Sequence, residues 1–356
     1  MNPNYRTLSE SEIESFAEEI DQLKVSVKKR IGTEDAHYIR KINRAVRYSG
    51  VLGRGFLFLS FLPWLWFVGV AFLALSKILD NMELGHNVIH GQFDFMGDPH
   101  YQGKNYEWDI MATSENWRET HNFKHHTYTN IEGHDEDIGY GFIRMFAGQP
   151  WSKWHILQPL YTLAFALVFQ WGVALQNVRF EKLAGKGWLP SLVHNNPNQW
   201  SKMKWQVIKD YVVFPLLAGP MFLYVLAGNA MANTIRNLWT FTIIFCGHFT
   251  EKAVMFPSSA INETRSGHWY LRQIQGSSNI SGGKWFHILS GNLSHQIEHH
   301  LFPEIPANRY AELAPRVREI CNRYGQSYNT GRLSKQFGQV WYRIFRHAFP
   351  SKATEC

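Results

Sequence analysis

Three long apolar stretches, separated by polar segments that are rich in histidine, dominate this sequence. They run from Gly55 to Ser76, from Ile156 to Val178 and from Tyr211 to Thr250. A helix needs about 20 apolar residues to cross a bilayer, so each stretch is long enough to enter one. The mean hydropathy of the whole chain is only -0.28, which means that a large polar portion lies outside the membrane. The pattern predicts an all-α integral membrane protein with a helical cap in water.

The third apolar stretch is long enough for two membrane spans. Arg236 is its only charged residue, and the pair Gly228 and Asn229 predicts a turn between the spans. If all the histidine-bearing segments share one aqueous side, the first stretch must also form a hairpin, with Pro63 near its turn. We therefore expect about four transmembrane helices.

The middle stretch, Ile156 to Val178, is expected to lie in the membrane interface or against the hairpins without crossing. Two tryptophans, Trp151 and Trp154, precede it, and tryptophan favours the membrane interface.

The two ends of the chain predict cytosolic amphipathic helices. In residues 1–48, one helix follows Ser9, which forms a capping box with Glu12, and Thr33 is the expected N-cap of a second. Residues 49–304 are the expected membrane domain. In residues 305–356, one helix should follow Pro306 and another should run from Leu333 to Ala348.

Charge sets the expected orientation. The chain carries 36 Lys and Arg against 29 Asp and Glu, a net charge of +7. Basic flanks lie on the cytoplasmic side of membranes, and both the N-terminus and the stretch from Arg179 to Lys204 are basic. The polar N-terminus indicates no cleaved signal peptide. Three cysteines without C-x-x-C spacing, Cys246, Cys321 and Cys356, suit a reducing compartment.

Eight of the 17 histidines fall in three compact boxes. The first is "GHNVIHG", with His86 and His90, and the second is "THNFKHHTYTN", with His121, His125 and His126. The third is "SHQIEHHLFP", with His295, His299 and His300. Residues four apart lie on one face of a helix, so each box can present two or more imidazoles together. Imidazole suits divalent iron, zinc and copper, and the ensemble therefore predicts a metal centre.

The residue types narrow the choice of metal centre. Zinc proteases need H-E-x-x-H, which "HNVIH" lacks. Carboxylate-bridged di-iron bundles need two E-x-x-H pairs and two further glutamates, and within the three boxes and their flanks Glu83 with His86 is the only such pair. So many imidazoles exceed the needs of one ion, which leaves a dinuclear, histidine-rich centre.

The three boxes together resemble those of the integral-membrane fatty acid desaturases. The stretches "NLSHQIEHHLFPEIPANRY", "WYLRQIQGSSNISGG" and "FCGHFTE" extend the similarity from about Met82 to about Tyr324, and they look most like the bacterial acyl-CoA delta-9 branch. The resemblance implies a fatty acyl-CoA desaturase that uses dioxygen and two electrons to make a cis double bond. It also implies a bacterial inner-membrane location, with the active site facing the cytosol.

The resemblance also implies a set of ligands for two iron ions. They are His86, His90, His121, His125, His126, His248, His299 and His300. Gln296 stands where stearoyl-CoA-type relatives have histidine, so it stays open whether Gln296 or His295 takes part. Asp135 and Asp137 are candidate hydrogen-bond acceptors for ligand N–H groups. The remaining histidines lack box spacing and are expected to be ordinary: His37, His100, His134, His155, His194, His268, His287 and His347.

The electrons must come from a partner, because the sequence shows neither an NAD fingerprint nor the His-Pro-Gly-Gly motif of a fused haem domain. By resemblance the partner is a ferredoxin-type reductase that uses NADPH. The other expected partners are the lipid bilayer and a fatty acyl-CoA, and no nucleic acid. Two alternatives remain: a di-iron membrane hydroxylase with the same boxes, and a non-catalytic metal- or haem-binding membrane protein.

Overall fold

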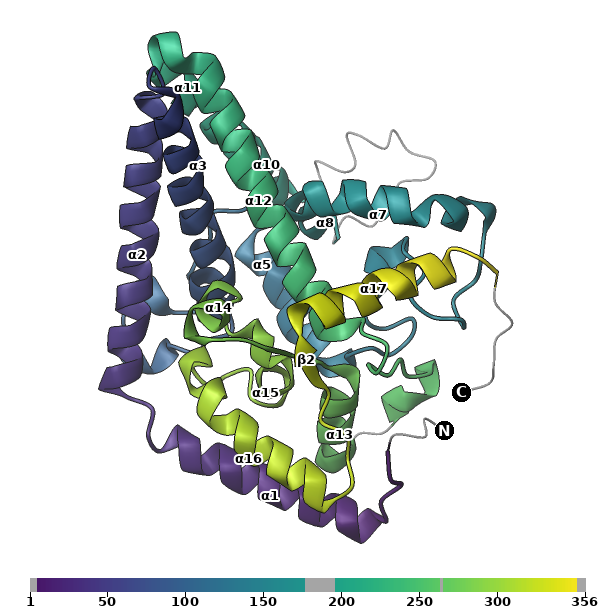
Figure 1. Cartoon of the computed structure of the whole chain (residues 1–356). Helices are drawn as coiled ribbons and strands as arrows, with labels where there is room; N and C mark the ends of the chain where they lie inside the picture. The colour runs from purple at the N-terminus through teal and green to yellow at the C-terminus, as the bar shows by residue number, and fades with distance from the viewer. Residues whose placement is uncertain (1–4, 177–195, 263–264, 351–356) are drawn as a thin grey trace.

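The computed structural model describes residues 5–176, 196–262 and 265–350, and it confirms the all-α prediction. Three long helices, α2 (Thr33–Phe58), α3 (Pro63–Ile78) and α12 (Phe222–His248), form an upright pillar. Two others, α1 (Glu10–Lys28) and α16 (Tyr310–Arg323), cross its lower end (Figure 1). The histidine boxes lie between the pillar and these crossing helices.

The predicted capping box at the start of α1 is confirmed. The Glu12 N–H donates to Ser9 Oγ at 3.3 Å, and the Ser9 N–H donates to the Glu12 carboxylate at 2.9 Å. The prediction that Thr33 caps the second helix is wrong, because Gly32 occupies the cap and Thr33 is the first helical residue. The Gly32 N–H donates to the carboxylate of Asp35 at 3.0 Å. Asp35 thus supplies one half of a capping box, by accepting from the N–H of the N-cap residue.

The first apolar stretch forms the expected hairpin. Helix α2 continues to Phe58, the chain turns, and Pro63 begins α3, so the prediction of a turn near Pro63 is confirmed. The two helices approach closely, because a Cβ on Gly53 would lie only 2.6 Å from the backbone nitrogen of Leu73. Apolar side chains are exposed at the tip of the hairpin: Leu59, Phe61, Leu62, Trp64 and Phe67.

The second hairpin differs from the prediction. No turn occurs at Gly228 and Asn229, because α12 runs unbroken through both. Gly228 instead lets α12 pack against α2, since a Cβ there would lie 2.5 Å from a methyl group of Leu57. The turn comes earlier, at Gly219, whose φ of 54° favours glycine. The incoming limb consists of α10 (Pro197–Ile208), the π-helix η8 (Lys209–Val213) and α11 (Phe214–Leu217), followed by the short helix η9 (Gly219–Met221).

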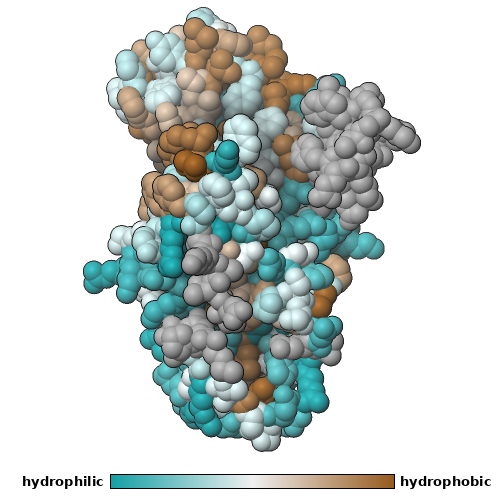
Figure 2. Space-filling model, turned by 90° about the vertical axis from the view of Figure 1, so that its right-hand side faces the viewer, coloured by the Kyte–Doolittle hydropathy of each residue, from teal (hydrophilic) through white to brown (hydrophobic). Residues whose placement is uncertain are grey.

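Both hairpin tips lie at the same end of the molecule (Figure 1). Leu216, Leu217 and Leu223 expose apolar side chains at the second tip, as their counterparts do at the first. Figure 2 shows hydrophobic residues concentrated at this upper end and hydrophilic ones over most of the lower half. The distribution is the one expected of a molecule with one end in lipid.

A buried ionic network fastens the two hairpins together. Lys77 Nζ lies 2.8 Å from the carboxylate of Asp210, and Arg54 Nη2 lies 3.2 Å from it. The amide of Asn233 donates to the same carboxylate at 3.1 Å. Arg54 and Lys77 of the first hairpin therefore both pair with Asp210 of the second hairpin.

The middle apolar stretch is broken. A short helix η6 (Lys153–Leu157) leads into α7 (Gln158–Leu167), and the chain then bends by 91° into α8 (Phe169–Leu175). In Figure 1, α7 runs beside α17 (Leu333–His347) and across the direction of the pillar. The end of this stretch, and residues 179–195 of the basic segment after it, lie outside the described residues.

One continuous helix among the described residues, Pro63–Ile89, is long and apolar enough to cross a membrane. The bent pair of α7 and α8 passes the same test only if both halves are counted together.

The C-terminal helices begin close to where the sequence predicted, with α16 after Pro306 and α17 at Leu333. A short parallel sheet pairs β1 (Asn279–Ser281) with β2 (Thr330–Arg332). The remaining elements are short: η1 (Leu79–Gly85), α4 (His86–Ile89), η2 (Asp94–Met96), η3 (Pro99–Tyr101), α5 (Ser114–Trp117), η4 (Arg118–His125), α6 (His126–Tyr128), η5 (Ile138–Gly141), η10 (Ser258–Asn262), α13 (Ser266–Gly276), α14 (Lys284–Leu289), η11 (Leu293–His295), α15 (Gln296–Leu301) and η12 (Ala307–Arg309).

Candidate metal centre

Each of the first two histidine boxes follows or overlaps a π-helical segment. The segment η1 leads directly into α4, which carries His86, and η4 contains His121 and His125. π-Helices are rare, wider than α-helices, and frequent at functional sites. They turn the histidines of both boxes toward a common centre.

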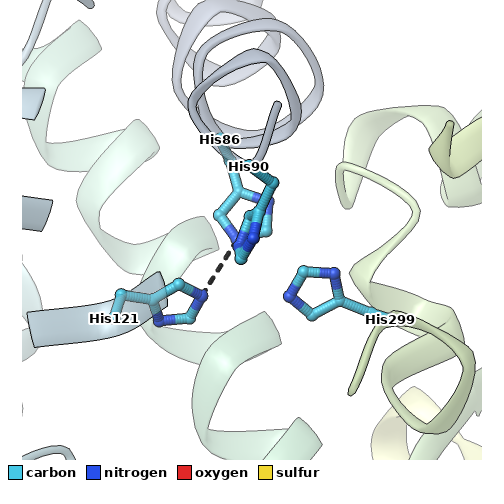
Figure 3. Close-up of side chains that lie close together, drawn as sticks. All are labelled: His86, His90, His121 and His299. Atoms are coloured by element: carbon cyan, nitrogen blue, oxygen red, sulfur yellow. Dashed lines mark hydrogen bonds between the residues drawn. The ribbon is translucent and has the colours of Figure 1, made fainter. Parts of the chain in front are cut away.

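The first cluster brings together one pair from box 1 and one histidine from each other box. The ligand atoms of His86, His90, His121 and His299 all lie within 4.8 Å of one another. Figure 3 shows the four rings converging from three separate segments. Within this cluster His86 Nε2 lies 3.2 Å from His121 Nε2.

The second cluster contains His125, His248 and His300. The Nε2 atom of His248 lies 3.3 Å from that of His125 and 3.1 Å from that of His300. His126 stands between the clusters, with ring centroids 4.8 Å from His299 and 4.4 Å from His300. All eight histidines of the expected ligand set therefore meet in one place, and His248 joins them from the last turn of α12.

Hydrogen bonds on the outer side of four rings determine which nitrogen faces inward. An Nδ1–H must be the donor to an amide or carboxylate oxygen, and to the Tyr310 hydroxyl, whose own O–H donates to the backbone oxygen of Phe302. The Nε2 atom of each neutral ring is then left with a free lone pair. The pairs are His125 with Asp135 at 3.0 Å, His300 with Gln273 at 2.9 Å, His86 with Asn87 at 3.2 Å and, more weakly, His299 with Tyr310 at 3.4 Å. Such outer partners orient a metal-binding imidazole and raise its basicity.

Carboxylates distinguish His125 from the other rings. Burial lowers the pKa of this imidazole, but Asp135 and Asp137 outweigh burial and raise it to about 9, so a metal ion bound at Nε2 of His125 must first displace a proton. Burial and neighbouring imidazoles hold the pKa of His126, His299 and His300 well below the usual range, so these rings are neutral. Neutral imidazole is the form that binds a metal.

The spacing of these nitrogens fits a metal ion. Two nitrogens that bind the same metal ion, each at about 2.1 Å, lie roughly 3.0 to 3.4 Å from one another. Three pairs of Nε2 atoms in the clusters lie 3.1 to 3.3 Å apart. In addition, the buried Nε2 atoms of His90, His126 and His299 have no hydrogen-bond partner among the described residues. Buried polar atoms are costly without a partner, and a bound cation would provide one for each.

Of the two residues left open by the sequence, Gln296 reaches the clusters and His295 does not. The amide nitrogen of Gln296 lies 2.8 Å from His248 Nε2, and its amide oxygen has no partner among the described residues. His295 instead stacks on His287, with ring centroids 4.5 Å apart. Asp137 lies near both clusters, with a carboxylate oxygen 3.6 Å from His121 Nδ1 and 3.5 Å from His125 Nδ1.

The other histidines stay outside both clusters wherever they are described, and His194 lies outside the described residues. The carboxylate of Glu83 also takes no part. It is fully buried, but it accepts hydrogen bonds from the Tyr38 hydroxyl at 2.6 Å and from the Asn292 amide at 2.9 Å. The carboxylate-bridged alternative thus finds no support in the geometry.

A narrow cavity begins at the clusters and follows α12 away from them. The cavity has a volume of about 30 Å³. His248, Ile244, Thr240 and Asn237 line it along α12, and Trp117 lines it near box 2, stacked 4.2 Å from the ring of His121. Its wall is mostly apolar by area, which suits a hydrocarbon ligand.

Sequence reasoning missed several residues that support the ligands. Gln273 lies far from every box, Tyr310 lies ten residues after His300, and no spacing rule points to either. Gln273 does fall within "WYLRQIQGSSNISGG", one of the stretches that carried the resemblance. Asn87 sits inside box 1, but only its contact with His86 Nδ1 gives it a role.

Fold and site together define a class: a helical protein with paired histidine clusters at the mouth of an apolar cavity. Comparison with known protein families identifies the family within this class. The family model "Fatty acid desaturase" matches residues 61–332. The chain belongs to the fatty acid desaturase family, whose members are membrane-associated.

Individual relatives agree with this assignment. The chain is 41% identical over 350 residues to the "NADPH-dependent stearoyl-CoA 9-desaturase" of Mycobacterium tuberculosis (strain CDC 1551 / Oshkosh), covering 97% of this chain and 82% of the relative. It is 26% identical to the "sn-1 linoleoyl-lipid 6-desaturase" of a Synechocystis strain, covering 73% of this chain and 74% of that protein.

Proposed function

We propose that this protein is an acyl-CoA delta-9 desaturase, which introduces a cis double bond into a saturated fatty acyl chain. The observation that carries the proposal is the pair of histidine clusters at one end of a narrow apolar cavity. The resemblance in the boxes and the name of the mycobacterial relative support the acyl-CoA substrate and the delta-9 position.

The histidines of the two clusters would hold two iron ions. His86, His90, His121 and His299 surround one position, His125, His248 and His300 surround the other, and His126 lies between them. When bound, the iron supplies the dioxygen-dependent oxidation that side chains alone cannot perform. Gln296 is the further candidate ligand, through its amide oxygen.

The protein's own part is to hold one pair of methylene groups beside the clusters and to keep water out. The cavity lies along α12, so an acyl chain threaded through it would pass His248 and the stacked Trp117. Restricting the chain to one path prepares a single carbon pair for reaction. The apolar wall excludes the water that would compete for the oxidant.

We propose the following placement in the membrane. The α2–α3 hairpin and the hairpin ending in α12 supply four transmembrane helices, and α7 lies in the interface. Support comes from the exposed apolar side chains at both tips and from the 91° bend after α7. The boxes and both termini face the cytosol of a bacterium, and the bilayer is its inner membrane. The division into residues 1–48, 49–304 and 305–356 stays a prediction, and α2 passes through its first boundary.

Two electrons per turnover must enter from outside. We propose a separate ferredoxin-type reductase that draws on NADPH, and the name of the mycobacterial relative includes NADPH dependence. The fatty acyl-CoA is the other soluble partner.

The deciding experiment supplies purified protein, reductase and NADPH with stearoyl-CoA or with a stearoyl phospholipid, followed by mass analysis and double-bond positioning. We expect stearoyl-CoA to lose two hydrogens at one defined position. A product that gains one oxygen would assign the protein to the hydroxylases of the same type. Desaturation of the phospholipid alone would reject the acyl-CoA assignment.

A further inference from the structure

The clusters are enclosed almost completely by protein. Seven of the eight histidines are buried, and His90 alone is partly exposed. His299 and His300 are both 0% exposed, so the side of the third box is closed to a soluble partner. The protein shell over the candidate metal centre is therefore thinnest where box 1 ends.

Box 2 reaches the surface at the same place. The side-chain amide of Asn122 donates to the backbone oxygen of Ile89 at 2.9 Å, which joins the outer turn of η4 to the end of α4. The residue after Asn122 is Phe123, whose side chain is 60% exposed. Phe123 is two positions from His121 on one side and from His125 on the other, so a short covalent path links this exposed ring to both clusters.

The surroundings of Phe123 are aqueous. Lys124 pairs with Glu136 at 2.8 Å and with Glu119 at 3.7 Å, and both carboxylates are largely exposed. The exposed phenylalanines Phe61 and Phe67 belong instead to the hairpin tip, which we place in lipid. Because Glu119 and Glu136 offset the charge of Lys124, the surface beside Phe123 offers a partner protein apolar contact rather than positive charge.

We propose that the electron donor docks on this surface, which consists of His90, Asn122, Phe123 and the ion pair of Lys124. The proposal rests on the proposed function, since only a desaturase that uses an external donor needs such a contact. The partner is the one-electron carrier that the NADPH-dependent ferredoxin-type reductase keeps reduced, and the edge of its cofactor is exposed within an apolar surface. Phe123 packs against that surface, and the electrons enter the centre beside His90 and His121.

The electron balance is complete. The donor is oxidised twice, by one electron at a time, and NADPH re-reduces it. Together with two protons and the two hydrogens lost from the acyl chain, the two electrons reduce one dioxygen molecule to two waters.

The test measures turnover of the iron-loaded, membrane-reconstituted protein at increasing concentrations of a [2Fe–2S] ferredoxin. The ferredoxin is one that supports turnover of the unaltered enzyme, and NADPH with ferredoxin reductase keeps it reduced. Truncating an interface anchor costs about 1 kcal/mol or more, so Phe123→Ala should raise the half-saturating ferredoxin concentration about fivefold or more. Phe123→Leu keeps apolar contact and should recover most of the loss. The matched control is Phe345→Ala on α17, because Phe345 is 54% exposed and lies outside the proposed surface. It should leave the concentration unchanged.

A second readout separates docking from chemistry. Single turnover driven by dithionite needs no docked protein, so Phe123→Ala should match the unaltered enzyme in dithionite-driven product yield, in iron content and in the KM for acyl-CoA. An unchanged half-saturating ferredoxin concentration overturns the proposal, and so does a parallel loss of dithionite-driven turnover. If the unaltered enzyme makes no desaturated product even with dithionite, the proposed function fails, irrespective of the docking surface.

Discussion

Replacing Asp135 by asparagine tests whether the residues behind the histidines control metal binding. One carboxylate oxygen of Asp135 accepts hydrogen bonds from the Asp137 N–H at 3.0 Å and from His125 Nδ1 at 3.1 Å. The other accepts from the Asn130 N–H at 2.8 Å and from His125 Nδ1 at 3.0 Å. Asparagine has one oxygen, so in either orientation its NH₂ group faces a backbone N–H, and its remaining bond to His125 lacks the charge.

The expected magnitude follows from that geometry. A hydrogen bond to a charged group contributes about 1.5 to 3 kcal/mol, and loss of an outer partner of a metal-binding histidine costs about 10- to 100-fold in metal affinity or activity. The backbone hydrogen bonds are present with and without metal, so their loss lowers overall stability. Loss of the His125 contact should appear directly in iron affinity.

The assay is anaerobic competition for ferrous iron between the purified protein and a chromophoric chelator. Asp135→Asn should weaken iron binding by about tenfold or more, and excess iron should restore part of the activity. Glu136→Gln is the matched control, because it removes a charge from the adjacent residue, whose side chain is 43% exposed and pairs with Lys124. An iron affinity for Asp135→Asn equal to that of Glu136→Gln would refute the reasoning.

Further predictions concern the metal, the boxes and the hairpins. Purified protein should contain about two iron atoms per chain, without stoichiometric zinc or haem, and elemental analysis that finds one zinc instead would reject the dinuclear iron centre. His125→Ala and His300→Ala should each abolish desaturation while the protein stays in the membrane fraction, whereas His347→Ala should be mild; equal loss in all three would mean that the boxes have no special role. Asp210→Leu removes the carboxylate that pairs directly with the buried Lys77, and breaking a buried pair costs about 3 to 5 kcal/mol. Folded protein recovered from membranes should then fall sharply, and an unchanged yield and thermal stability would contradict this account of the network.

The sequence predicted the parts of the site that follow from local spacing. His86 with His90, and His121 with His125, are four residues apart, and the structure brings both pairs to a common centre. Spacing could not predict the π-helical turns beside both boxes, because α- and π-helical turns share the same residue types. The contact between Gln273 and His300 was equally out of reach, since it depends on how α13 packs against α15.

The error at Gly228 has a physical origin. Glycine serves both for turns and for close helix contacts, and the sequence alone does not distinguish the two uses. The contact of Gly228 with Leu57 decides the matter, and that contact joins residues from different hairpins. A similar ambiguity affected Thr33, where a better capping group, Asp35, stands two residues further on.

The ionic network between the hairpins has a consequence for how the chain is made. Arg54 and Lys77 leave the ribosome long before Asp210, which follows Lys77 by 133 positions. Until the aspartate arrives, the first hairpin carries two cations with no anion from the second hairpin to neutralise them, and such charges are costly in hydrocarbon. In the membrane placement proposed above, we therefore expect the first hairpin to settle fully only when the second joins it.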